Sequence, residues 1–152
     1  MKRVFICAVV AAGLTVQTSA LSLPLGFGIG LRLGGATTQV SGLLVGVDAT
    51  VPSISLLHGF KTRVDFDTWG QPMSGWDRST GGTAATVCQV VDGLIGYYGF
   101  GVGFSRLRLH GDAYEGPEAK LLSGLNVLGL GLEVNLHLGK IRAWTGMVRF
   151  RF

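Results

Sequence analysis

The sequence predicts an all-β fold: a single antiparallel, up-and-down transmembrane β-barrel of eight strands. Three observations support this prediction. Segments in which apolar and non-apolar residues alternate recur along the chain, whereas helical periodicity does not. The non-apolar positions of these segments hold glycines and ions of both signs rather than a uniform row of long solvated side chains. The chain ends in an amphipathic segment whose last residue, Phe152, is aromatic.

The first twenty residues have the features of a secretory signal peptide. Lys2 and Arg3 precede an apolar run, and residues 17–20 supply the small side chains that a signal peptidase reads. The run is shorter than the roughly 17–25 residues of a spanning helix. We therefore expect a signal peptide over residues 1–20 and one barrel domain over residues 21–152.

The composition is apolar and rich in glycine, with 47% hydrophobic residues, 14% charged residues and 25 glycines. No later segment is long and apolar enough for a spanning helix, so the exported chain is either soluble or inserted as strands. Cys88 is the one cysteine outside the predicted signal peptide, which excludes an intramolecular disulfide. Without Lys2 and Arg3 the formal charge falls from +4 to +2, too little to indicate a nucleic-acid partner.

The first three expected strands alternate clearly. In residues 25–33, aliphatic and aromatic residues alternate with glycines and Arg32. In residues 43–51, valines alternate with Gly46, Asp48 and Thr50. In residues 60–69, Phe, Val and Thr alternate with four ions: Lys61, Arg63, Asp65 and Asp67. Because successive side chains of a strand point to opposite faces, each segment has one apolar and one polar or glycine-rich face.

Glycine-rich and polar stretches are expected to connect these strands. Residues 34–42 and 70–83 are interpreted as loops, and Asp92-Gly93 as a hairpin turn after a weaker strand at residues 84–91. In the fifth segment, residues 94–109, aromatic residues and Val102 alternate with glycines until the parity changes near Ser105. A bulge, or emergence of the strand from lipid, would explain the change.

The last third of the chain is expected to contain a loop at residues 110–118 and further strands. Residues 119–138 are long enough to divide near Ser123-Gly124, which raises the count from seven to eight. We favour eight because single-chain bacterial barrels have even numbers of strands. The final strand, residues 141–152, opposes an apolar face to Thr145, Met147 and two arginines.

The glycine-and-ion faces are expected to line a narrow lumen, and the aliphatic faces to contact lipid. Small residues and opposite charges suit an interior in which space is short and ions pair. The predicted polar network of the lumen comprises Arg32, Asp48, Lys61, Arg63, Asp65, Asp67, Glu133, His137, Arg149 and Arg151.

Together with the signal peptide, three segments resemble small bacterial outer-membrane β-barrels of the OmpA transmembrane domain, OmpX and opacity-protein group. They are residues 97–104 (YYGFGVGF), 129–136 (GLGLEVNL) and 148–152 (VRFRF). The resemblance implies an outer-membrane location, contact with outer-membrane lipid and assembly by the barrel-assembly machinery. Val148, Phe150 and Phe152 resemble the signal which that machinery reads.

The function expected from this resemblance is non-enzymatic: an envelope-structural or surface-interaction role through the extracellular loops. Trp69 and Trp76 are candidate contacts with an unknown surface ligand, or alternatively lie at the lipid interface. A narrow channel or carrier for small solutes is the first alternative. A lipid-A-modifying enzyme and a soluble lipocalin-like barrel that binds an apolar ligand follow it.

Catalytic, metal and cofactor sites have little support in the sequence. His137 shares a strand face with Glu133, which could orient a catalytic histidine, but Ser105 and Ser123 have no evident base. The three histidines show no metal-ligand spacing. The alternating glycines of residues 99–103 do not have the spacing of a dinucleotide-binding loop. No catalytic residue, metal or cofactor is therefore expected.

Overall fold

The computed structural model describes residues 27–37, 42–51, 59–70, 81–109, 112–127, 130–140 and 142–152. The signal peptide expected at residues 1–20 and the candidate contact Trp76 lie outside these residues. Among the described residues there is no helix long and apolar enough to cross a membrane.

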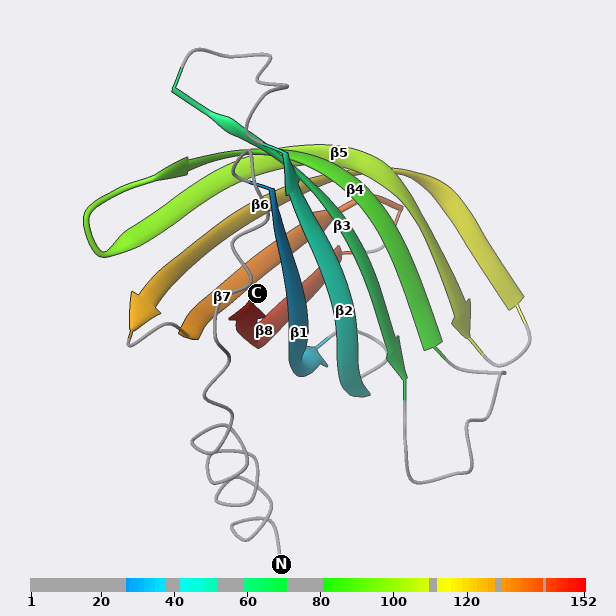
Figure 1. The fold of residues 1–152 in the computed structure, drawn as a ribbon. Coiled ribbons are helices and arrows are strands. Elements are labelled where there is room, and N and C mark those ends of the chain that lie inside the picture. Colours follow the sequence, from blue (N-terminus) through cyan, green and yellow to red (C-terminus); the bar gives the residue numbers. More distant parts are fainter. Residues whose placement is uncertain are drawn as a thin grey trace, which may run out of the picture.

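Eight antiparallel strands close into a barrel, in which each strand pairs with its neighbours in sequence and β1 pairs with β8 (Figure 1). This confirms the predicted fold and strand count. The strands are β1 (Gly28–Thr37), β2 (Gly42–Val51), β3 (Lys61–Gly70), β4 (Gly81–Asp92), β5 (Gly96–Leu109), β6 (Asp112–Val127), β7 (Leu130–Leu138) and β8 (Arg142–Arg151). We call the end at which β1 begins and β8 ends the terminal end, and the opposite end the loop end.

The outer wall is apolar and the interior is polar. Large outward side chains such as Phe66, Val102 and Trp144 are 51%, 67% and 55% exposed. Inward ions such as Arg32 and Asp65 are fully buried. A lipocalin-like barrel would have the opposite arrangement, so that alternative does not describe this chain. An apolar exterior of this kind suits contact with lipid.

Two of the expected loops are largely strand. β1 continues through Gly34 and Gly35 to Thr37, and Gly42 already belongs to β2, so at these residues the predicted loop at 34–42 was wrong. A Cβ at Gly34 would collide with the backbone of β8, which shows that this glycine allows a close approach of strands rather than a turn. The predicted loop at residues 110–118 was also wrong, because β6 begins at Asp112 and pairs with β5 from there on.

The sixth and seventh strands do not divide at Ser123-Gly124, because β6 continues to Val127 and β7 begins at Leu130. Gly124 lies inside β6 with its missing side chain beside the ring of Tyr97, so it makes room for an aromatic residue of the lumen. The expected bulge near Ser105 is also absent from the described strands. The β5–β6 register runs without interruption from Gly96–Leu125 to Leu109–Asp112.

Candidate functional site: the sealed lumen and its loop end

The middle of the lumen is filled by a network of four cations and four anions contributed by six strands. Its cations are Arg32, Arg63, Lys120 and Arg149, and its anions are Asp48, Asp65, Asp67 and Glu133. The charges balance to zero. In a barrel of eight strands the interior has room for side chains and little else, so such ions remain only if they neutralise one another.

Arg63 and Lys120 together bind all three carboxylates of β3 and β7. The Arg63 guanidinium donates to both carboxylate oxygens of Glu133, over 2.7 and 2.9 Å, and to Asp65 over 2.9 Å. Lys120 Nζ donates to Asp65 over 2.7 Å and to Asp67 over 3.0 Å. These ions are therefore held by several partners each, which is the condition under which buried charges are tolerated.

The other two cations complete the network on β1, β2 and β8. Arg32 Nη2 lies 2.9 Å from Asp67 Oδ1, and its Nη1 lies 3.1 Å from Asp65 Oδ2. Arg149 Nε donates to Asp48 Oδ2 over 2.8 Å. Charge-assisted hydrogen bonds of this length are roughly twice as strong as neutral ones, so the network ties the barrel wall together from the inside.

The network also closes the lumen to water. The side chains of Arg32, Asp65 and Lys120 have no exposed surface, and the same is true of Asp67 and Asn135. A water-filled channel would leave the side chains that line it accessible. The midsection of the barrel is therefore a packed polar core.

The structure separates three members of the predicted network from the rest. Lys61 lies at the terminal end, where its Nζ is 2.6 Å from Asp92 Oδ2 and both side chains are about two-fifths exposed. Arg151 is exposed at the same end, beside Gly28. His137 lies toward the loop end, and its partner is Glu118.

Several residues of the lumen were not foreseen from the sequence. Lys120 and Glu118 come from β6, the strand whose faces the sequence left unassigned. Tyr97, whose hydroxyl donates to Glu133 over 2.9 Å, lies at the start of β5. Parity could have placed Tyr97, which lies two residues before the inward Gly99 of β5. For Glu118 and Lys120 the sequence offered no recognised lumen position of β6 from which to count.

An apolar cluster lies inside the barrel at the loop end. Trp69, a predicted loop or interface contact, points into the lumen from β3 and is 6% exposed, so this expectation was wrong. The cluster consists of Ala36, Leu44, Trp69, Ala84, Leu107 and Met147. It also accounts for the parity change in β5, because Leu107 points inward and Arg106 outward without a bulge.

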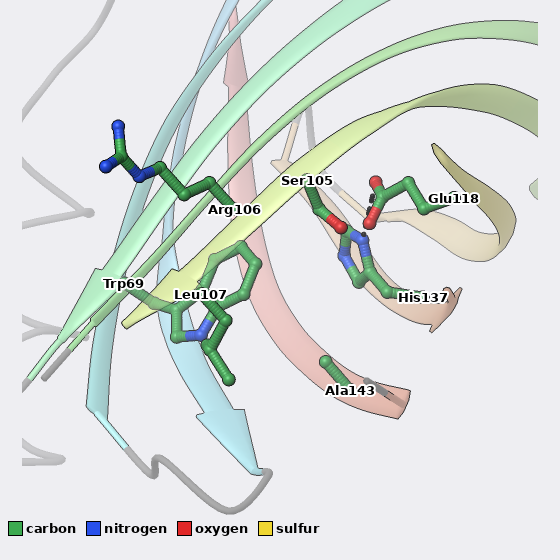
Figure 2. A pocket seen from close by; sticks show the side chains of 7 residues that line it. All are labelled: Trp69, Ser105, Arg106, Leu107, Glu118, His137 and Ala143. Carbon is green, nitrogen blue, oxygen red and sulfur yellow. Dashed lines mark hydrogen bonds and ion pairs between the residues drawn. The ribbon is translucent and has the colours of Figure 1, made fainter. Parts of the chain in front are cut away.

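A small cavity of about 10 Å³ lies beside this cluster, lined by Trp69, Ser105, Arg106, Leu107, Glu118, His137 and Ala143 (Figure 2). His137 Nδ1 is 3.2 Å from Glu118 Oε1, and its Nε2 is buried without a hydrogen-bond partner. The rings of Trp69 and His137 have centroids 5.7 Å apart.

The cavity brings a serine close to a histidine–carboxylate pair, but its size limits what it can do. No hydrogen bond joins Ser105 to His137 among the described residues. A cavity of this volume holds about one water molecule. Among the described residues, no group of three or more His, Cys, Asp or Glu side chains is arranged to hold a metal ion. We therefore regard Glu118 and His137 as packing and hydrogen-bonding residues of the loop end.

The predicted assembly signal is placed on the last strand. Val148 and Phe150 lie on the outward face of β8, opposite Leu33 and Leu31 of β1. The amide of Phe152 donates to the carbonyl of Ile29 over 2.8 Å. The C-terminus is thus bonded into the seam that closes the barrel, and recognition of these residues by an assembly machinery stays a prediction.

Comparison with known proteins supports the fold. No family model matches the sequence, and no curated protein matches it. The structure is similar to neisserial surface protein A, with a TM-score of 0.54 and 13% identity over 82% of this chain and 94% of that one. It is also similar to the N-terminal β-barrel domain of Pseudomonas aeruginosa OprF, with a TM-score of 0.56 and 12% identity over 82% and 97%. The chain therefore has the fold of small eight-stranded outer-membrane barrels of the OmpA and OmpX type.

Proposed function

We propose that this chain is an exported outer-membrane barrel that acts without catalysis, as a structural element of the envelope that presents its loop end for surface interactions. The observation that carries the proposal is the sealed lumen. Its midsection has no accessible side-chain surface at Arg32, Asp65 or Lys120, so the interior offers neither a route for solutes nor room for a substrate. Interactions with other molecules are then left to the outer wall and the two ends.

The loop end has a feature suited to such contacts. β7 pairs with β6 only from Ala119 onward, so residues 112–118 are bonded to β5 on one side and to no described strand on the other. Residues 112–115 are exposed. An open strand edge can accept an additional strand from a partner through main-chain hydrogen bonds. Gly139 and Lys140 lie against part of this segment, and the side chain of His137 contacts Glu118.

The proposed orientation places the loop end outside the cell. An even number of strands puts both chain ends on one side of the membrane. A chain that reaches the outer membrane from the periplasm keeps its ends there if only hairpins cross. The terminal end is then periplasmic, and the hairpin of β5 and β6 faces outward.

Two measurements test the location and the orientation. The protein should resist carbonate extraction from membranes and migrate at a different apparent mass when it is not boiled, and a carbonate-soluble, heat-indifferent protein would refute the membrane location. Ala113→Cys at the loop end should react with a membrane-impermeant maleimide on intact cells. Leu94→Cys, which is also exposed but lies at the terminal end, should react only after permeabilisation. The reverse pattern would overturn the orientation.

The narrow-channel alternative is tested by planar-bilayer recording. Because the midsection is packed, we expect the purified barrel to give no discrete conductance steps. Stable unitary steps that scale with the amount of folded protein would favour a channel. Altered lipid A mass on overexpression, abolished by His137→Ala, would favour an enzyme.

A further inference from the structure

Charged side chains on the outer wall are confined to one end of the barrel. Alternation within the described strands directs four ions outward: Arg106 and Arg108 on β5, Glu115 on β6 and Arg142 on β8. All four lie within the loop-end part of their strands, and the outward positions of the terminal-end part carry none among the described residues. The outer wall therefore has a cationic rim at the loop end only.

The arginines of this rim lie beyond exposed aromatic residues in the direction of the loop end. Phe104 precedes Arg106 on the outward face of β5, and Trp144 lies two residues from Arg142 on β8. Both aromatic side chains are more than half exposed. Aromatic residues form girdles at the boundary between hydrocarbon and headgroups. Arg106 and Arg108 are the next two outward positions of β5 beyond Phe104. They are therefore at the level of the lipid headgroups.

Arg106 and Arg108 form a compact pair. They are two residues apart on one face of a strand, which separates their Cα atoms by about 7 Å. Arg106 is among the residues that line the small cavity, but Figure 2 shows its side chain extending away from Ser105 and His137. Its Nε lies 2.8 Å from Glu115 Oε1, which leaves its two terminal nitrogens available. Arg108 has no ion-pair partner among the described residues.

We propose that Arg106 and Arg108 bind a phosphate group of a phosphorylated glycolipid in the outer leaflet. Arginine's planar fork binds phosphate through two parallel hydrogen bonds, and a second guanidinium within reach can hold the same or a neighbouring phosphate. The acyl chains of such a lipid would lie along the exposed apolar side chains of β5 below, which include Phe104 and Val102. The inference rests on the proposed outward orientation of the loop end.

Glu115 makes the proposal sharper, because it competes with the phosphate. Its carboxylate occupies one nitrogen of Arg106 and repels an incoming anion. Removal of this charge should therefore strengthen phosphate binding. If the Arg106–Glu115 pair had only a structural role, its loss would instead weaken the binding that depends on the pair.

The experiment uses the folded full-length barrel in a neutral detergent, with native mass spectrometry to count bound lipid. The probe is bisphosphorylated lipid A, compared with chemically dephosphorylated lipid A. We expect the double variant R106A/R108A to bind the phosphorylated lipid roughly tenfold or more weakly, the loss of two charge-assisted contacts. Arg151→Gln, which removes one cation at the terminal end, should bind as the unmodified protein does, and Glu115→Gln should bind more tightly.

The source of the phosphate is distinguished by competition with millimolar inorganic phosphate. Failure to compete identifies the lipid headgroup as the ligand, and complete competition identifies a general phosphate site at the same residues. The proposal is overturned if the double variant keeps full affinity, or if dephosphorylated lipid A binds equally well. Folding of each variant is checked by gel heat-modifiability. Because binding is measured in detergent, its failure is separate from failure of the maleimide test of orientation.

Discussion

Arg63 on β3 and Glu133 on β7 join opposite walls of the barrel through two parallel hydrogen bonds of 2.7 and 2.9 Å. Three strands separate β3 from β7 in either direction around the barrel. Both residues are fully buried, and Glu133 also accepts a hydrogen bond from Tyr97. The pair therefore acts as a brace across the lumen, and its removal should be felt by the whole barrel.

Loss of this brace should cost much more stability than loss of a surface pair with the same chemistry. We expect Glu133→Gln to lower the free energy of unfolding by about 3–5 kcal/mol, because it leaves Arg63 buried with incomplete compensation. Glu115→Gln removes the exposed partner of Arg106, at 2.8 Å, and should cost no more than about 1 kcal/mol. Urea unfolding in phospholipid vesicles, followed by tryptophan fluorescence, measures both. Equal losses would contradict the cross-lumen brace.

The contribution of Lys120 to stability should depend strongly on the two carboxylates that it bridges, Asp65 and Asp67. Lys120→Met leaves Asp65 and Asp67 without their ammonium partner, and we expect a loss of about 3–5 kcal/mol. Loss of Lys120 leaves the network with one negative charge in excess, and adding Asp67→Asn removes it, so the double variant should be more stable than Lys120→Met alone. A double-mutant cycle in the same vesicles measures the coupling. Additive costs would show that the ions are not one network.

Glycines of β6 should differ sharply in their tolerance of a methyl group. A Cβ at Gly124 would lie 2.6 Å from the Tyr97 hydroxyl, which bonds to Glu133. Gly124→Ala should therefore destabilise the barrel by about 1–3 kcal/mol through overpacking. A Cβ at Gly116 meets nothing within 4 Å, so Gly116→Ala should change stability by less than about 0.5 kcal/mol. Comparable effects of the two substitutions would show that the Tyr97 packing is incorrect.

Removal of the largest side chain of the loop-end cluster should not open the barrel. Trp69→Ala takes an indole from the apolar cluster, but the ions of the midsection remain packed below it. We expect this variant to be as silent as the unmodified protein in planar bilayers, although less stable by about 3–5 kcal/mol. Discrete conductance in Trp69→Ala alone would mean that the apolar cluster, and not the charge network, seals the lumen.

The faces of the strands were predictable because alternation in the sequence maps directly onto inside and outside. Arg63, Asp65 and Asp67 in β3 lie on the predicted inner face, and the alternating glycines of β5 do likewise. This part of the fold depends only on local geometry, since successive side chains of a strand point in opposite directions. The same rule predicted that Lys61 and Arg151 face inward, but not that the barrel ends there and leaves them exposed.

The misplaced residues of the loop end share one physical cause, which is that the interior changes from polar to apolar along the barrel axis. Trp69 and Leu107 are apolar yet point inward, because the loop end of the interior is an apolar cluster. A prediction that places every apolar side chain against lipid therefore assigns these two residues to the wrong side of the wall. Partners across the lumen, such as Lys120 with Asp67, were also out of reach. They depend on the stagger between distant strands, which alternation within one strand does not contain.

The neutrality of the charge network has a consequence for how the barrel enters a membrane. Within the network, β1, β6 and β8 each contribute one excess positive charge, and β2, β3 and β7 each contribute one excess negative charge. A sheet that lacks any one of these strands exposes an unmatched ion to a medium of low polarity, at a cost of several kcal/mol. Stepwise insertion, strand by strand, would meet this cost repeatedly. Insertion and closure are therefore expected to occur together. Pairing of β1 with β8 would then be part of the insertion step and would not follow it as a separate event.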